Sequence, residues 1–123
     1  MNRQPIMLID DSRVSRMMFI KFLNDTPLQF DIHEADSGED ALKVFAQKPE
    51  IRKFVVDFNM PGINGLQLIE RIQESVSDAK FNLLTANTQP DVFARCKALD
   101  VTVTTKPITR DKVIGIIKSL NNL

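Results

Sequence analysis

The stretch IMLIDDS, residues 6–12, decides the fold class of this chain. Its four consecutive apolar residues are typical of a short strand that is buried on both faces, as the strands of a parallel sheet are. Two aspartates end the strand, and from Ser12 to about Asn24 apolar residues recur at helical spacing. A buried strand followed directly by an amphipathic helix is the repeating unit of parallel α/β sheets.

The same unit recurs from this stretch to the end of the chain. Further strands are predicted at residues 30–35, 54–56, 81–85 and 101–105. A segment with helical spacing follows each of them, and Ser37, Pro90 and Thr109 are residue types that begin helices. Five strands that alternate with five helices predict an α/β fold, a doubly wound five-stranded parallel sheet with helices on both faces.

Apolar residues at helical spacing are expected to pack on this sheet. Helix by helix, they are Met18, Phe19, Phe22 and Leu23; Ala41, Leu42, Phe45 and Ala46; Leu66, Leu68, Ile69 and Ile72; Val92, Phe93, Cys96 and Leu99; and Val113, Ile114, Ile117 and Leu120. Val14, Met17 and Ile20 fall off the core face of the first helix. They are either isolated surface residues or residues that dock a partner's helix pair.

Composition limits the possible functions. The length of 123 residues fits one domain, residues 1–123, and 16 basic residues balance 16 acidic ones, so no net field attracts nucleic acid or an anionic membrane. A single cysteine excludes an internal disulfide framework and a cysteine zinc site. Neither a membrane span nor a signal peptide is predicted. We therefore expect a cytoplasmic domain without nucleic-acid or membrane partners.

Polar residues stand where four of the predicted strands end. Asp10 and Asp11 follow the first strand, Asp57 follows the third, Thr85 closes the fourth and Lys106 follows the fifth. Each of them alone has a structural interpretation as a helix cap, a turn residue or a strand exit. Because ligands of open α/β sheets bind beyond the carboxyl ends of the strands, we expect all five residues to lie together at one edge.

Three carboxylates at one edge repel one another. At ~5 Å separation and an effective dielectric near 20, each pair costs about 3 kcal/mol, and one lysine does not offset two or three such pairs. A hard divalent cation with oxygen ligands does, and Mg²⁺ suits such a site. The cation and Lys106 favour a phosphoryl group, so the central Asp57 is a candidate nucleophile that forms an acyl phosphate.

Four short motifs surround these residues. They are IDDS (residues 9–12), VVDFNMPG (55–62) followed by Asn64 and Gly65, LTA (84–86) and TKP (105–107). Together they resemble the receiver domain of bacterial response regulators, most closely the stand-alone chemotaxis type, and the resemblance covers essentially the whole chain. It implies a flavodoxin-like fold and a phosphorylation-controlled signalling domain rather than an enzyme with a diffusible product.

The resemblance also implies the roles of the charged residues. Asp57 is expected to accept a phosphoryl group from a phosphohistidine of a sensor histidine kinase or a histidine phosphotransfer protein. Asp11, Asp57 and the backbone carbonyl of Asn59 are expected to bind Mg²⁺, with Asp10 acting directly or through water. Lys106 is expected to pair with phosphoryl oxygens and stabilise transition-state charge.

Other residues are implied to control access and switching. Thr85 is expected to turn its hydroxyl toward the phosphoryl group, Ala86 to leave the entrance open, and the peptide bond before Pro107 to be cis. Asn59 and Asn87 flank the path of the hydrolytic water. Because both are modest in size and uncharged, we expect ready self-dephosphorylation.

The chain departs from the family at the output end. Val103 stands where the family usually has the Tyr or Phe of an aromatic switch, and residues 99–102 lack the usual Gly-Ala loop. Valine has one stiff χ1 angle and little surface, so a rotating aromatic gate is not expected. Signalling is expected to rely on Thr85 and backbone shifts around residues 86–105, and to reach an unknown downstream protein by direct contact.

Two alternatives remain open on the sequence. The chain is compatible with a receiver domain cut from a longer regulator that has an output domain. The expected combination of carboxylates, Mg²⁺ and a lysine is also found in aspartate-nucleophile phosphatases. Those enzymes usually carry a second aspartate two residues after the nucleophile, where this chain has Asn59.

Overall fold

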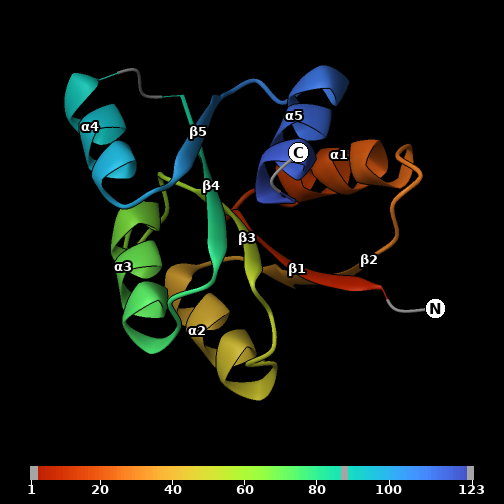
Figure 1. Cartoon of the computed structure of the whole chain (residues 1–123). Helices are drawn as coiled ribbons and strands as arrows, with labels where there is room; N and C mark the ends of the chain where they lie inside the picture. Colours follow the sequence, from red (N-terminus) through yellow and green to blue (C-terminus); the bar gives the residue numbers. More distant parts are fainter. Residues whose placement is uncertain (1–2, 87–88, 122–123) are drawn as a thin grey trace.

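The computed structural model describes residues 3–86 and 89–121 and contains one parallel sheet with helices on both faces (Figure 1). The strands are β1 (Gln4–Ile9), β2 (Phe30–Ala35), β3 (Lys53–Asp57), β4 (Lys80–Thr85) and β5 (Thr102–Thr105). The helices are α1 (Arg13–Asn24), α2 (Gly38–Gln47), α3 (Gly65–Ser75), α4 (Pro90–Ala98) and α5 (Arg110–Leu120). The predicted fold class is confirmed. In the two described ranges, no helix is long and apolar enough to cross a bilayer.

The sheet has the strand order β2-β1-β3-β4-β5, and every neighbouring pair is parallel. From β1 the chain first passes outward to β2 and then returns to β3 on the other side of β1. The direction of winding therefore reverses between β1 and β3. In open α/β sheets, the carboxyl ends of the strands at such a reversal form the binding crevice.

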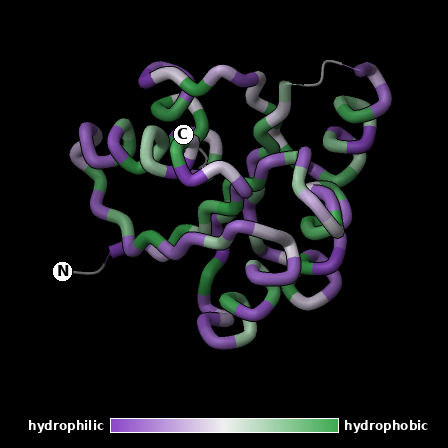
Figure 2. The backbone as a smooth tube through the Cα atoms, turned by 180° about the vertical axis from the view of Figure 1, so that it is seen from behind, coloured by the Kyte–Doolittle hydropathy of each residue, from purple (hydrophilic) through white to green (hydrophobic). Residues whose placement is uncertain are grey.

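Two apolar cores lie on opposite faces of the sheet. Helices α1 and α5 cover one core, and α2, α3 and α4 cover the other (Figure 1). Alternate residues of β1 serve both: Ile6 and Leu8 belong to the first core, Met7 and Ile9 to the second. In Figure 2 the central strands are largely coloured as hydrophobic, whereas hydrophobic and hydrophilic residues alternate along the helices. This two-sided burial explains why β1 is a continuous apolar run.

The helix faces were predicted correctly in part. Phe19 and Leu23 are buried as expected, but Met18 is 43% exposed, whereas Ile20 packs partly against the core. The buried stripe of α1 is centred between Phe19 and Leu23, and successive residues of a helix lie about 100° apart, so Met18 falls outside it. The prediction for Met18 was therefore wrong.

Two further helices show smaller errors of the same kind. In α5, Ile116 is buried in place of the expected Ile114, because the buried set follows the spacing i, i+3, i+4, i+7 from Val113. In α2, Ala46 is exposed while Val44 packs against the core. The expected core residues of α3 are all buried.

Polar caps begin the helices close to the ends of the strands. The hydroxyls of Ser12, Ser37 and Thr109 each accept a hydrogen bond from a backbone N–H of the first helical turn. Asn64 and Gln67 form a reciprocal capping box at the start of α3, with both hydrogen bonds 2.9 Å long. The helix starts at Ser37 and Thr109 were predicted from the sequence. All four caps lie in short connections beside the crevice.

Candidate functional site

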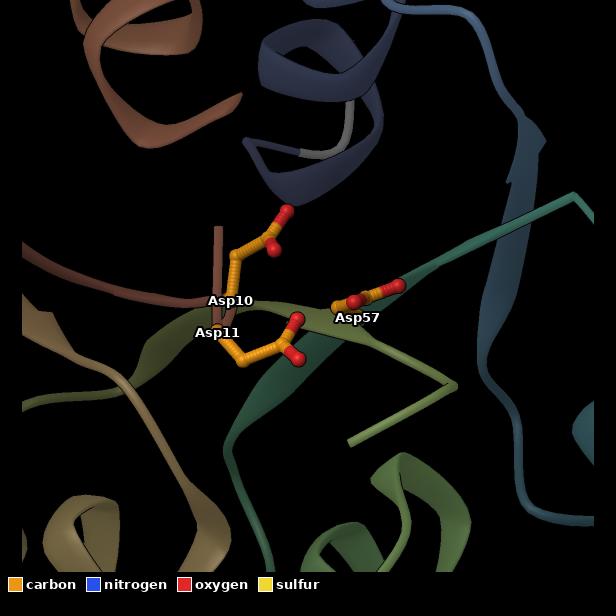
Figure 3. Close-up of side chains that lie close together, drawn as sticks. All are labelled: Asp10, Asp11 and Asp57. Carbon is orange, nitrogen blue, oxygen red and sulfur yellow. The ribbon is translucent and has the colours of Figure 1, made fainter. Parts of the chain in front are cut away.

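Three aspartates meet at the carboxyl ends of β1 and β3 (Figure 3). Asp10 and Asp11 directly follow β1, and Asp57 is the last residue of β3. One carboxylate oxygen from each lies within 4.8 Å of the other two. Asp10 and Asp57 are buried and Asp11 is exposed. The sheet therefore brings together the three acidic residues that the sequence predicted to converge.

Lys106 completes the cluster from the end of β5. Its Nζ lies 3.1 Å from Oδ1 of Asp57 and 3.5 Å from Oδ2 of Asp10. Burial alone lowers the pKa of the Lys106 ammonium, but the carboxylates of Asp10 and Asp57 outweigh burial, and the net pKa is raised. The lysine is therefore a cation held between two acids.

The Asp57 carboxyl group has a raised pKa. Burial, followed by the negative charge of Asp10, raises the pKa of Asp57 from 3.8 to about 6, while Lys106 opposes the rise. The residue is only 4% exposed. One lysine does not balance the acids, so the site favours a further positive charge.

Backbone hydrogen bonds hold Asp10 in place. Its N–H donates to the carbonyl of Ala35 over 3.1 Å, which extends the pairing of β1 with β2 by one residue. Its Oδ1 accepts the N–H of Ser12 over 2.9 Å, at the start of α1. Asp10 is therefore fixed by its own strand, by the neighbouring strand and by the following helix.

The donor set fits Mg²⁺. It consists of oxygens only, two of its carboxylates are buried, and their mutual repulsion is what a hard divalent cation relieves. Asn59, whose backbone carbonyl is the further expected ligand, is an exposed residue of the connection between β3 and α3. The arrangement is a buried nucleophile candidate with a lysine and two further acids beside it.

Comparison with known proteins identifies the family. The model of the response regulator receiver domain matches residues 6–118. This chain belongs to the receiver domain family. The receiver domain is 31% identical over 90 residues to response regulator UvrY of Escherichia coli K12, covering 73% of this chain and 41% of UvrY. It is 26% identical over 93 residues to two-component response regulator ORR11 of Oryza sativa, covering 74% of this chain and 62% of ORR11.

Solved structures show the same fold. The chemotaxis protein CheY4 of Vibrio cholerae superimposes with a TM-score of 0.84 at 23% identity, covering 97% of this chain and 99% of CheY4. The CheX–CheY–BeF3–Mg complex of Borrelia burgdorferi gives a TM-score of 0.86 at 21% identity, covering 96% of this chain and 89% of that chain. The receiver domain spans less than two thirds of UvrY and of ORR11.

Three more of the expected residues, Thr85, Ala86 and Pro107, lie next to Lys106. Thr85 is buried at the end of β4, and its carbonyl accepts the N–H of Lys106 over 3.0 Å. Ala86 is exposed, and the peptide bond between Lys106 and Pro107 is cis, as the resemblance implied. Asn87 lies outside the described residues.

Val103 lies in β5, where it is half-buried against the core formed with α2, α3 and α4. It pairs with Leu83 of β4. No aromatic ring therefore occupies this position on the strand that leads to Lys106.

Sequence reasoning missed two residues next to the site. Met18 was expected in the core, but it lines an open cavity of about 420 Å³ together with Ala86, Lys106 and Pro107. Arg16 donates a hydrogen bond to the backbone carbonyl of Asp10. The signal for Arg16 was its place one helical turn after Ser12, on the turn of α1 next to the end of β1.

Proposed function

We propose that this receiver domain accepts a phosphoryl group on Asp57 from the phosphohistidine of a sensor histidine kinase or a histidine phosphotransfer protein. The observation that carries the proposal is the position of Asp57, buried at the end of β3 with Lys106 Nζ 3.1 Å away and two further carboxylates within 4.8 Å. Membership of the receiver domain family supports the same assignment.

The transfer is a displacement at phosphorus. A carboxylate oxygen of Asp57 forms a bond to phosphorus while the bond from phosphorus to the donor imidazole nitrogen breaks. The bonding electron pair stays on that nitrogen, which takes up a proton, and Asp57 becomes an acyl phosphate. Lys106 offsets the negative charge of the transferred group, as a fixed cation does at developing charge.

Asp10, Asp11, Asp57 and the backbone carbonyl of Asn59 are the residues that would hold Mg²⁺. The bound ion supplies positive charge against the phosphoryl oxygens. The carboxylates of the buried Asp10 and Asp57 repel each other in the absence of the ion. Binding of the ion by these oxygens would therefore reduce that repulsion.

The alternative of an aspartate-nucleophile phosphatase has less support. Asn59, two residues after Asp57, offers no carboxyl group to act as general acid or base. We therefore propose a phosphoacceptor domain with intrinsic autophosphorylation and self-dephosphorylation, rather than an enzyme that releases a product. The modest size of Asn59 and Asn87 is the reason to expect ready self-dephosphorylation.

Partner recognition is proposed at α1. Val14 and Met17 are 66% and 59% exposed on this helix. Exposed apolar side chains next to a phosphorylation site are suited to insert between the helices of a phosphodonor protein. The downstream partner is a protein, contacted in the cytoplasm by the phosphorylated form either directly or through an output domain of a longer chain.

Signalling without an aromatic switch is proposed to use Thr85 and the backbone of residues 86–105. Thr85 is well placed for this role because its carbonyl bonds to Lys106 and its strand pairs with β5. Addition of beryllofluoride and Mg²⁺ is expected to move amide NMR signals in residues 86–105. Movement confined to another surface contradicts this route.

The phosphoacceptor proposal is tested with acetyl phosphate and Mg²⁺. Intact mass spectrometry is expected to show the addition of one phosphoryl group that is lost in mild base. The Asp57→Ala variant is expected to stay unmodified. The control Asp78→Ala replaces an exposed aspartate just before β4, at the edge of the sheet opposite the site, and is expected to be modified like the parent. A parent chain that gains no acid-labile or base-labile adduct overturns the proposal.

A further inference from the structure

Arg16 of α1 bridges the end of β1 and the end of β2. Its Nη1 donates to the backbone carbonyl of Asp10 over 2.5 Å, and its Nε donates to Oε1 of Glu34 over 2.9 Å. The Arg16 side chain is 14% exposed, although Arg13 and Met17 of the same helix are exposed. A guanidinium can make such a bridge because its donors form a rigid planar fork.

The carbonyl that Arg16 holds belongs to the peptide bond between Asp10 and Asp11. A peptide unit is planar, so fixing its carbonyl oxygen also fixes the direction in which the next residue leaves. Asp10 has two further restraints, the bonds with Ala35 and Ser12. In the described part of the chain, no hydrogen bond or ion pair is recorded for the exposed Asp11 carboxylate, so its place depends on the backbone.

We propose that Arg16 is a positioning residue for divalent-cation binding, which it supports by holding the Asp10–Asp11 peptide and so aiming the Asp11 carboxylate at the cluster. Glu34 acts behind it by fixing the plane of the guanidinium. The inference rests on the proposed function, since it assigns a role in the cation site of the phosphoacceptor.

Electrostatics and positioning predict opposite signs for the removal of Arg16. A positive charge near three carboxylates opposes the binding of a second cation, so loss of that charge alone tightens binding. Loss of the bond to the Asp10 carbonyl loosens the Asp11 ligand and weakens binding. Replacement of a residue that orients a metal ligand typically lowers metal affinity tenfold or more, so the loss of positioning is expected to outweigh the loss of charge.

The test measures Mn²⁺ affinity by electron paramagnetic resonance, because the chain has no Trp or Tyr to report binding by fluorescence. Arg16→Gln is expected to bind Mn²⁺ about tenfold more weakly than the parent. Arg13→Gln is the matched control: Arg13 is exposed on the same helix, and the substitution removes the same charge. It is expected to bind Mn²⁺ as tightly as the parent or more tightly.

Two further measurements separate positioning from stability. Arg16→Lys keeps the charge and one donor, and it is expected to recover part of the affinity. In metal-free buffer, the amide NMR signal of Asp11 is expected to shift in Arg16→Gln and to stay in place in Arg13→Gln. Should Arg16→Gln fail to fold, Arg16→Lys carries the test, with an affinity below that of the parent.

The outcomes distinguish this inference from the proposed function. Arg16 variants that bind Mn²⁺ as tightly as the parent overturn the positioning role and leave the phosphoacceptor proposal standing. A parent chain that binds no Mn²⁺ overturns both the cation site and the role of Arg16. Weaker binding by the same factor in both Arg16→Gln and Arg13→Gln also overturns the inference, because the effect is then not specific to the hydrogen bond from Arg16 to the Asp10 carbonyl.

Discussion

Lys106 reaches across β4 to place its Nζ 3.1 Å from Oδ1 of Asp57, so that the ends of β3 and β5 are joined by a charged contact. The two residues belong to strands that do not pair with each other, because β4 lies between them. The same Nζ lies 3.5 Å from Oδ2 of Asp10. The ammonium group of Lys106, at the end of β5, therefore interacts electrostatically with carboxylates at the ends of both β1 and β3.

Replacement of this lysine is expected to make Asp57 a weaker acid. Lys106 lowers the pKa of Asp57, against the larger effects of burial and Asp10, so Lys106→Met is expected to raise that pKa above about 6. Carboxyl ¹³C NMR titration in metal-free buffer measures the change. Lys118→Met, an exposed replacement in α5, serves as control. An Asp57 pKa that is the same in both variants contradicts the electrostatic role of Lys106.

Asp57 is expected to destabilise the fold at neutral pH. Its pKa is raised in the folded chain from 3.8 to about 6, so the folded state favours the protonated form. Protonated Asp57 therefore contributes to the free energy of unfolding a favourable amount that is fully present below about pH 4. This contribution, of the order of 3 kcal/mol, is lost as the pH rises through about 6. Asp57→Asn, which resembles the neutral form, is expected to be more stable than the parent by about 2 kcal/mol at pH 7.5.

Urea unfolding in the presence of a chelator measures this difference across pH. The advantage of Asp57→Asn is expected to shrink toward zero as pH falls to 4. Glu50→Gln, at an exposed acid in the loop before β3, is expected to change stability little at either pH. An Asp57→Asn variant with the same advantage at pH 4 and pH 7.5 contradicts the assigned pKa.

The sequence allowed the convergence of Asp10, Asp57 and Lys106 to be predicted, because parallel strands end at one edge and each residue follows an apolar run. Depth of burial was not predictable in the same way. Asp57 has a pKa of about 6 chiefly because the neighbouring elements exclude water from it. That exclusion depends on side chains distant in sequence.

The errors at Met18 and Arg16 have a related cause. Apolar spacing defines a helix face to within about one residue, or about 100°, and Met18 stands at that limit. The contact from Arg16 to the Asp10 carbonyl depends on how α1 packs against β1 and on the rotamer of the Arg16 side chain. Neither the angle between the helix and the strand nor the rotamer is encoded in residue periodicity.

Gly65 is expected to be essential for the geometry of the site. A Cβ at this position would lie 2.5 Å from the backbone oxygen of Asp57 and 2.9 Å from Cδ1 of Leu83. Because backbone cannot yield as a flexible side chain does, Gly65→Ala is expected to destabilise the fold by about 2 kcal/mol and to displace Asp57. Thermal unfolding and the efficiency of modification by acetyl phosphate measure the two effects.

Gly115 provides the matched control for this substitution. It lies within α5, and a Cβ there would have no heavy atom within 4 Å. Gly115→Ala is expected to stabilise the helix by about 0.5–1 kcal/mol and to leave modification unchanged. Equal stability changes in the two variants would contradict the steric role of Gly65.

Asn82 is a buried polar residue in β4 whose replacement is expected to stabilise the protein. Its Nδ2 donates to Oγ1 of Thr102 over 2.7 Å, but none of the described residues donates to its buried Oδ1. An unpaired buried acceptor costs about 1–3 kcal/mol. Thr102 keeps a bond to the carbonyl of Phe81 when Asn82 is replaced. Asn82→Val is therefore expected to gain about 1 kcal/mol, which raises Tm by about 4 °C.

Asn82→Asp separates the effect of the polar atom from that of size. It keeps the shape of the side chain but places a carboxyl group where Asn82 is 1% exposed, so it is expected to unfold at a lower temperature than the parent. Thermal unfolding of the three chains at pH 7.5 is expected to give the order Asn82→Val, parent, Asn82→Asp. A parent chain more stable than Asn82→Val means that the Asn82 oxygen finds a donor in the groove between β5 and α5, since Asn82, Thr102 and Ser119 line that groove.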